Sequence, residues 1–76
     1  MKRSRKYRVT LRSAGEWLTD GAQIIFAGNH AAARDVARSD LPGLGSIVET
    51  YRPRSYSMIY GFSNGDALCV ERLPDN

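Results

Sequence analysis

The sequence contains few residues of the types that build disulfides, metal sites or active centres. Its 76 residues include one cysteine, Cys69, and one histidine, His30. A disulfide needs two cysteines and a cysteine-based zinc site needs several, so neither can form within this chain. Nothing in the spacing brings His30 and Cys69 together, and the carboxylates are scattered without a paired arrangement. We therefore predict that the protein is not an enzyme, that it binds no metal or cofactor, and that Cys69 is a small core residue.

Long apolar runs are missing as well. No run approaches the roughly 20 residues that a membrane-spanning helix needs. The basic N-terminus is not followed by the apolar segment of about 7–15 residues that marks a secretory signal. Together with the single cysteine, which is typical of a reducing compartment, these features predict a cytoplasmic protein without membrane contact.

The basic residues are unevenly distributed. The chain carries a formal charge of +3, with eleven basic and eight acidic residues. Five of the eleven basic residues lie in the first eight positions, at Lys2, Arg3, Arg5, Lys6 and Arg8, which leaves six against the eight acidic ones. We predict that residues 1–6 form a flexible basic arm and that residues 7–76 form a single domain. The arm is either a solubilising tail or an electrostatic contact for phosphates or an acidic protein surface.

Two strands are expected before the helix. Residues 7–12 alternate strictly between apolar and polar positions, which predicts a half-buried strand whose polar face carries two arginines. Residues 22–27 form the second strand. Ile25 breaks its alternation, so we expect it to be central or covered on both faces. Between the strands, Trp17 is interpreted as a lid at the edge of the core, with an exposed interface anchor as the alternative.

One short helix follows Asn29, whose side chain is a good N-cap. On a helical wheel its small apolar positions form one arc and its charged positions the opposite arc. The apolar arc contains Ala32, Ala33, Val36 and Ala37, and the charged arc contains Arg34, Asp35 and Arg38. Arg34 and Arg38 lie one turn apart, so they form either a solvated face or a patch for a carboxylate or phosphate.

Three strands complete the chain, over residues 46–52, 55–62 and 66–73. Pro53 interrupts the first of them and predicts either a sheet edge or the end of a strand. Asn64-Gly65 predicts a two-residue hairpin turn. That turn pairs Phe62 with Ala67, Tyr60 with Cys69 and Met58 with Glu71. It places Tyr56, Met58, Tyr60 and Phe62 on one face, and the pattern does not decide which face is exposed. The element order is β-β-α-β-β-β, an α+β fold with a mostly antiparallel sheet and one helix on one face.

Four segments resemble small phage-encoded anti-CRISPR proteins, and most of all a type I-F inhibitor. They are residues 20–27 (DGAQIIFA), residues 31–38 (AAARDVAR), residues 45–50 (GSIVET) and the Asn-Gly hairpin, which together lie within residues 20–73. The basic arm and the loop around Trp17 have no counterpart in that family. The resemblance implies a strongly curved sheet and a stoichiometric inhibitor in the cytoplasm of a bacterial host cell. Relatives bind the Cas7 backbone of the Cascade surveillance complex and block its binding of target DNA.

The resemblance implies Cas proteins of a type I Cascade complex as partners, with weak nucleic-acid contact through the arm. It favours acidic or aromatic contacts, including Glu16 and Asp20. The predicted partner-binding residues are Tyr51, Arg52, Arg54, Tyr56, Tyr60, Arg34, Arg38 and Trp17, and the predicted nucleic-acid arm is Lys2, Arg3, Arg5, Lys6 and Arg8.

Two alternatives remain open. The basic clusters and interleaved aromatics also suit a small nucleic-acid-binding phage regulator. We expect a monomer, although an exposed sheet edge could also form a homodimer.

Overall fold

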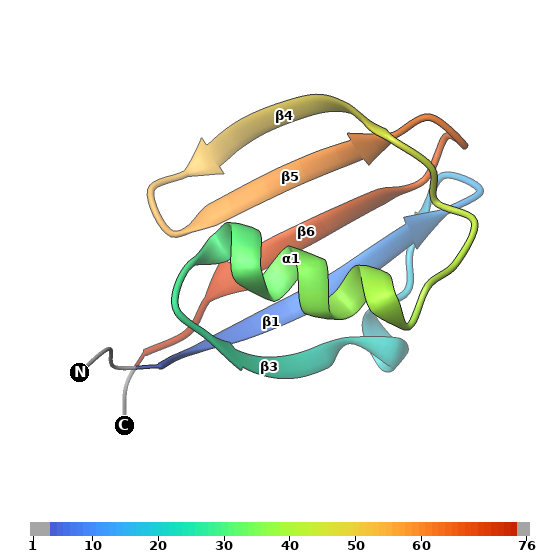
Figure 1. Cartoon of the computed structure of the whole chain (residues 1–76). Coiled ribbons are helices and arrows are strands. Elements are labelled where there is room, and N and C mark those ends of the chain that lie inside the picture. Colours follow the sequence, from blue (N-terminus) through green and yellow to red (C-terminus); the bar gives the residue numbers. More distant parts are fainter. Residues whose placement is uncertain (1–3, 75–76) are drawn as a thin grey trace.

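The structure, a computed structural model, describes residues 4–74. An antiparallel, curved sheet forms one layer, and a single helix crosses one of its faces (Figure 1). In chain order the elements are β1 (Arg5–Ser13), β2 (Glu16–Trp17), the 3₁₀ helix η1 (Thr19–Gly21), β3 (Gln23–Ala27), α1 (His30–Ser39), β4 (Ile47–Arg54), β5 (Ser57–Phe62) and β6 (Ala67–Arg72). The predicted α+β fold with one short helix is confirmed, while β2 and η1 were not expected.

Strand β1 is the centre of the sheet. The strands follow the order β2-β1-β6-β5-β4, and β3 pairs with β1 on the same side as β2. Because β1 is nine residues long, its first half pairs with β3 and its last two residues pair with β2. The N-terminal strand therefore organises the sheet.

Strand β1 begins at Arg5, two residues earlier than predicted. Arg5 pairs with Ala27 and Lys6 pairs with Phe26, because β3 continues to Ala27 and needs a partner along its full length. The alternation of apolar side chains predicts which faces they occupy, but it does not predict how far the backbone pairing with β3 extends. Arg5 and Lys6 of the predicted arm therefore belong to the sheet, whereas Lys2 and Arg3 lie outside the described residues.

The core lies between the sheet and α1. Alternate side chains of β1, β3, β5 and β6 point toward the helix, and Ala33 and Ala37 are its fully buried contacts. Each fully buried large aliphatic side chain contributes about 1.5–3 kcal/mol relative to an exposed one. The buried cluster consists of Tyr7, Val9, Ile25, Ala27, Ala33, Ala37, Leu44, Tyr60, Phe62, Leu68 and Val70.

Helix α1 begins where the sequence predicts. The Asn29 side-chain oxygen accepts a hydrogen bond from the backbone N–H of Ala32 at 2.8 Å, which confirms the N-cap. The predicted buried arc is too wide on one side, because Val36 is 48 % exposed. The small residues Ala33 and Ala37 face the sheet and let the helix lie close to it.

The β5–β6 hairpin differs from its predicted register by one residue. Tyr60 pairs with Leu68, not with Cys69. The loop has three residues, since the N–H of Phe62 donates to the carbonyl of Asp66 and only Gly65 has positive φ, at 96°. This geometry is typical of a type I turn followed by a left-handed glycine, which also accommodates an Asn-Gly pair. Because a slip of one residue exchanges the faces, Tyr60 shares the core face with Leu68.

Strand β3 is an edge strand, so the prediction that it is central or covered on both faces is wrong. Among the described residues it pairs with β1 alone, and α1 covers one of its faces. Ile25 points into the core, while Ile24 and Phe26 are 53 % and 67 % exposed. The predicted edge position of the strand that contains Pro53 is confirmed, because β4 ends the sheet order.

Candidate binding face

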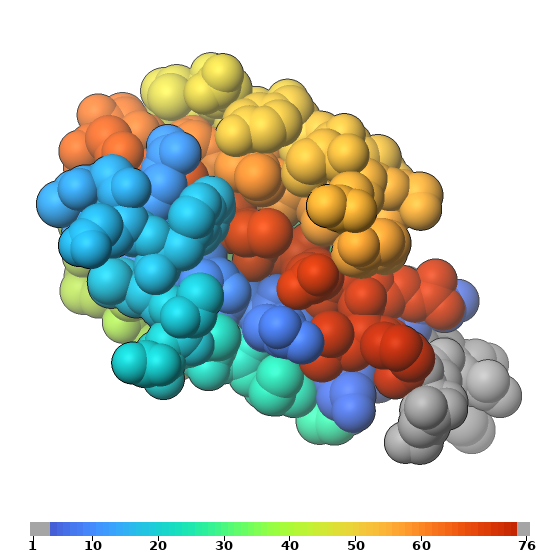
Figure 2. All heavy atoms as spheres, turned by 180° about the vertical axis from the view of Figure 1, so that it is seen from behind, coloured from blue at the N-terminus to red at the C-terminus, as the bar shows by residue number. Residues whose placement is uncertain are grey.

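The face of the sheet opposite α1 carries most of the side chains that could bind a partner. We call it the open face. Figure 2 shows the molecule from this side, where side chains of the strands form the surface and α1 lies behind them. Cross-strand partners in an antiparallel sheet share a face. The residues that the register assigns to the open face include Lys6, Arg8, Thr10, Arg12, Trp17, Ile24, Phe26, Tyr51, Ile59, Cys69 and Glu71, together with the buried Ser57 and Ala67.

Basic side chains form a row along β1, and each one faces an apolar partner on the neighbouring strand. Lys6 is paired with Phe26 and Arg8 with Ile24. The third pair lies beyond the end of β3, where Arg12 is opposite Trp17 of β2.

The spacing within this row follows from strand geometry. Positions two residues apart on one face of a strand are separated by about 7 Å. Lys6 and Arg8 are therefore about 7 Å apart, and Arg12 lies about twice that distance from Arg8, with Thr10 between them. Positive charge on β1 and apolar surface on β3 and β2 therefore run side by side along about 20 Å of the sheet.

Arg12 and Trp17 contact each other directly. The guanidinium carbon of Arg12 lies 5.4 Å from the ring centroid of Trp17, which is a cation–π arrangement. Trp17 is 38 % exposed. This exposure does not fit the preferred prediction of a lid on the core, and the role of an interface anchor stays a prediction. The tight turn that brings it there contains Ala14 and Gly15, both with positive φ.

Arg8 forms one weak ion pair within the part of the chain that the structure describes. Its Nη1 lies 3.9 Å from Oε1 of Glu71 on β6, and both side chains are substantially exposed. An ion pair of this kind contributes about 0–1 kcal/mol. Arg8 can therefore exchange Glu71 for an external anion at little cost.

Cys69 lies on the open face between Thr10 and Ile59 and is half-buried. The prediction that it is a core residue is wrong, because it rested on residue type alone, whereas the register places Cys69 on the face opposite α1. Burial raises the pKa of the Cys69 thiol, and the nearby Glu71 carboxylate raises it further, while Arg8 opposes both effects.

Arg34 and Arg38 do not form an outward patch on α1. The guanidinium of Arg34 lies 4.9 Å from the ring of Tyr60, and that of Arg38 lies 5.3 Å from the ring of Phe62. Arg34 also pairs with Asp35 at 2.9 Å, and its side chain is only 19 % exposed. The two predicted partner-binding arginines of α1 are thus turned back onto the covered face of the sheet.

Tyr60 is buried beneath Arg34 and is only 4 % exposed. Burial raises the pKa of Tyr60, and the charge and hydrogen bond of Arg34 oppose that rise. From this position Tyr60 cannot contact a partner, which corrects its predicted role.

The end of the β4–β5 hairpin holds the other predicted contact residues. Tyr51 and Tyr56 are 44 % and 41 % exposed. Arg52 and Arg54 are also exposed, and Nη1 of Arg52 donates to the carbonyl of Ser55 at 3.0 Å. The carbonyl of Tyr56 lies 2.9 Å from Nε2 of His30, so this hairpin is attached to the start of α1.

The open face includes residues that the sequence prediction did not select. Arg12 was noted on the polar face of its strand, but not as a contact residue. Ile24 and Phe26 were expected to be covered. The strict alternation of residues 7–12 was the signal for Arg12, whereas only the edge position of β3 exposes the other two.

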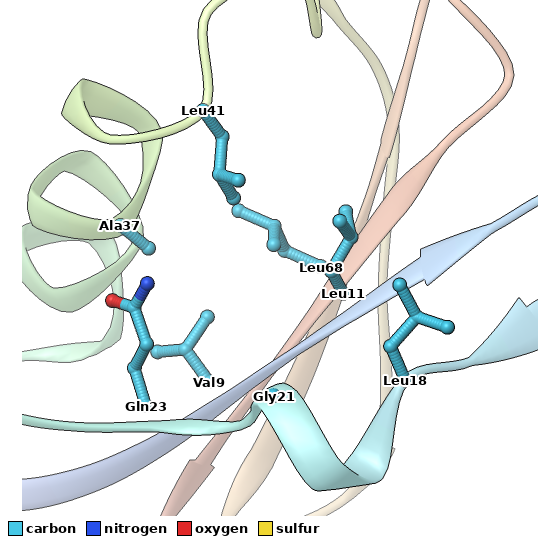
Figure 3. A pocket seen from close by; sticks show the side chains of 8 residues that line it. All are labelled: Val9, Leu11, Leu18, Gly21, Gln23, Ala37, Leu41 and Leu68. Atoms are coloured by element: carbon cyan, nitrogen blue, oxygen red, sulfur yellow. The ribbon is translucent and has the colours of Figure 1, made fainter.

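A separate apolar cavity of about 90 Å³ lies on the covered face, beneath the C-terminal end of α1 (Figure 3). Gln23 is its one polar side chain, and Figure 3 shows Leu41 and Leu68 pointing toward each other across it. The lining residues are Val9, Leu11, Leu18, Gly21, Gln23, Ala37, Leu41 and Leu68.

Within residues 4–74, no three histidine, cysteine or acidic side chains lie close enough to hold a metal ion. No helix in that range has the length and apolar character required to cross a membrane. No family model, curated protein or solved structure matches this chain. The geometry of the open face is therefore the main guide to function.

Proposed function

We propose that the protein is a non-catalytic binding protein that holds single-stranded nucleic acid on its open face. One observation carries this proposal. Each of the three basic residues on the open face of β1, Lys6, Arg8 and Arg12, faces an exposed apolar or aromatic side chain across the strand pair.

This arrangement supplies both interactions that single strands use. Basic side chains neutralise phosphates, and aromatic side chains stack on unpaired bases with little regard to sequence. Trp17 and Phe26 provide ring faces at the two ends of the basic row, and Tyr51 provides a third on β4. Unpaired bases can spread over a sheet surface, whereas stacked duplex bases cannot. The net charge of +3 adds long-range attraction.

Fluorescence anisotropy with a labelled single-stranded oligonucleotide tests the proposal over a range of salt concentrations. Three phosphate contacts predict a slope of about −2 for log affinity against log salt. Trp17 is the one tryptophan in the chain. Its emission is expected to be quenched as bases stack on it, which reports the open face directly.

A matched pair of variants separates local contact from net charge. Arg8→Gln removes one positive charge from the open face, and Ala31→Glu lowers the net charge equally at an exposed position in the first turn of α1. We expect Arg8→Gln to weaken binding about tenfold and Ala31→Glu to weaken it much less. Equal losses, or no binding at low salt, would contradict the proposal.

A second candidate is a stoichiometric inhibitor of a type I CRISPR-Cas surveillance complex, in the cytoplasm of a bacterial cell. The exposure of Trp17, Tyr51 and Tyr56 favours it, because aromatic anchors dominate many protein interfaces. Co-purification with Cascade complexes of several subtypes tests it. This candidate predicts a complex that Tyr51→Ala weakens and Arg8→Gln leaves intact, and it fails if no subtype binds.

A further inference from the structure

The two free edges of the sheet differ sharply. The outer strand β4 contains Pro53, charged residues and two irregularities of register. Such features prevent an edge from pairing with another strand. The outer strand β3 has the sequence QIIFA and pairs with β1 without a register shift. It has no charge, no proline and no bulge, so nothing on this edge prevents pairing.

Backbone hydrogen bonds show which groups of β3 face outward. The carbonyl of Lys6 accepts from Leu73, and that of Leu11 accepts from Leu18. Even-numbered residues of β1 therefore bond toward β6, and odd-numbered residues bond toward β3 and β2. It follows that Ile25 bonds to β1, while Ile24 and Phe26 direct N–H and C=O away from the sheet. Within residues 4–74, no backbone group bonds to Ile24 or Phe26 on that outer side.

Apolar side chains flank this edge on both faces. Ile24 and Phe26 lie on the open face and are 53 % and 67 % exposed. On the other face, Arg34 and Arg38 of α1 extend toward β5, where they contact Tyr60 and Phe62. Val36 lies on the opposite side of the helix, about 160–200° around its axis from both arginines. Val36 therefore faces the side of β3, and it is 48 % exposed.

We propose that two copies of this chain pair through β3 in an antiparallel, two-fold symmetric manner. The outward groups fix the register, with Ile25 opposite the partner's Ile25 and Ile24 opposite the partner's Phe26. Both Ile24–Phe26 pairs then exchange two hydrogen bonds, and the two β-sheets become one. Registers centred on Ile24 or Phe26 align fewer outward groups.

Charge and area are compatible with this dimer. The two β1 strands are separated by three strand spacings, about 14 Å, which exceeds the screening length of about 8 Å at physiological salt. Their basic rows therefore repel each other only weakly. Two paired five-residue strands with their flanking apolar side chains make a small contact, and interfaces below about 1,200 Å² are typical of weak, transient association. The dimer is accordingly reversible, and it does not depend on the proposed function.

Sedimentation equilibrium of the full chain tests the dimer over a concentration series. We expect the mass to rise from the monomer toward twice that value and to stop there, because a two-fold contact is closed. A monomer at every concentration, or growth beyond a dimer, would overturn the proposal.

The two edges provide a matched pair of variants. Phe26 on β3 and Val48 on β4 are both 67 % exposed, so lysine at either position leaves the core intact. We expect Phe26→Lys to abolish dimerisation and Val48→Lys to dimerise like the wild type. Circular dichroism confirms that each variant is folded, and Ile24→Lys is a second disrupting variant. Loss of the dimer in Val48→Lys, or its survival in Phe26→Lys, contradicts the assignment to β3.

Cysteine pairing tests the register, in a Cys69→Ser background. Chains with Ile24→Cys mixed with chains with Phe26→Cys should form disulfide-linked dimers under mild oxidation, since directly opposed strand positions suit a disulfide. Each variant alone should crosslink far less. Efficient crosslinking within either single variant would indicate a different register and refute the proposed one.

Discussion

The two faces of the sheet use the same pair of residue types for different purposes. On the covered face, Arg34 lies 4.9 Å from Tyr60, which is 4 % exposed. On the open face, Arg12 lies 5.4 Å from Trp17, which is 38 % exposed. The contact geometries are similar. What differs is whether the second surface of the aromatic ring faces the core or solvent.

This difference indicates that burial of the ring decides the role of the arginine. When the ring is buried, the aliphatic part of the arginine side chain packs over the edge of the core, and its guanidinium stays at the surface. An arginine beside an exposed ring leaves both groups accessible to a ligand. Substitutions on the two faces should accordingly affect different measurements.

The largest contrast is expected between buried and open positions on neighbouring strands. Leu68 of β6 is fully buried, so Leu68→Ala should lower the free energy of unfolding by about 2–5 kcal/mol. Ile59 of β5 is half-buried on the open face, and Ile59→Ala should cost about 1 kcal/mol. Urea unfolding followed by circular dichroism measures both. Equal costs would show that the open face is covered in solution.

Arginines on the two faces should differ by a smaller amount. Nη2 of Arg38 donates to the carbonyl of Gly45 at 2.8 Å, and its guanidinium lies over Phe62. Arg38→Ala should therefore lower the free energy of unfolding by about 1–2 kcal/mol. Arg8→Ala should change it by about 0.5 kcal/mol or less, whereas the proposed function predicts that it weakens binding of the oligonucleotide. Comparable costs in urea titrations would remove the distinction between the two faces.

The buried ring should also produce a pH dependence. Because burial raises the pKa of Tyr60, the folded protein keeps the phenol proton at pH values where the unfolded chain has lost it. The unfolded state then binds fewer protons, so the free energy of unfolding falls as pH rises through about 10. Below that pH Tyr60 contributes no such slope. Urea titrations between pH 8 and 11 should show a steeper fall for wild type than for Tyr60→Phe, and identical slopes would argue against burial.

The smallest effect concerns the thiol on the open face. Cys69 reacts as its thiolate, and its raised pKa should slow modification by a disulfide reagent relative to the unfolded chain. Glu71→Gln removes one cause of the rise and should speed the reaction by a few-fold at constant pH. Glu49→Gln removes an exposed carboxylate that is not among those causes and serves as the control. A similar acceleration in both variants would contradict the assignment of Glu71 as the carboxylate that raises the pKa of Cys69.

Local sequence patterns predicted those parts of the fold that depend on local chemistry. The alternation of residues 7–12 identified β1 and its two faces, Asn29 marked the start of α1, and Pro53 marked an edge strand. Each signal depends on neighbours within a few positions. They established the element order and the α+β architecture.

Features that depend on loop length or on side-chain reach were not predictable in the same way. Asn64-Gly65 suits both a two-residue and a three-residue loop, because each places a glycine at positive φ. Because of that ambiguity, Tyr60 was predicted to pair with Cys69, whereas it pairs with Leu68. A helical wheel likewise places Arg34 away from Ala33, but the long arginine side chain reaches back over β5. The candidate site was therefore only partly visible, through the polar face of β1.

The central position of β1 also constrains how the chain acquires its fold. Its pairs with β6 join residues 55 to 65 positions apart, from Arg12–Ala67 to Tyr7–Arg72. During synthesis β1 leaves the ribosome before β6, so the edge of β1 that pairs with β6 stays unpaired until β6 has emerged. Contacts of such long sequence separation make folding slow, on the order of milliseconds to seconds. A nascent chain that lacks β6 therefore exposes the edge of its longest strand, and the final residues of the sheet complete the whole structure.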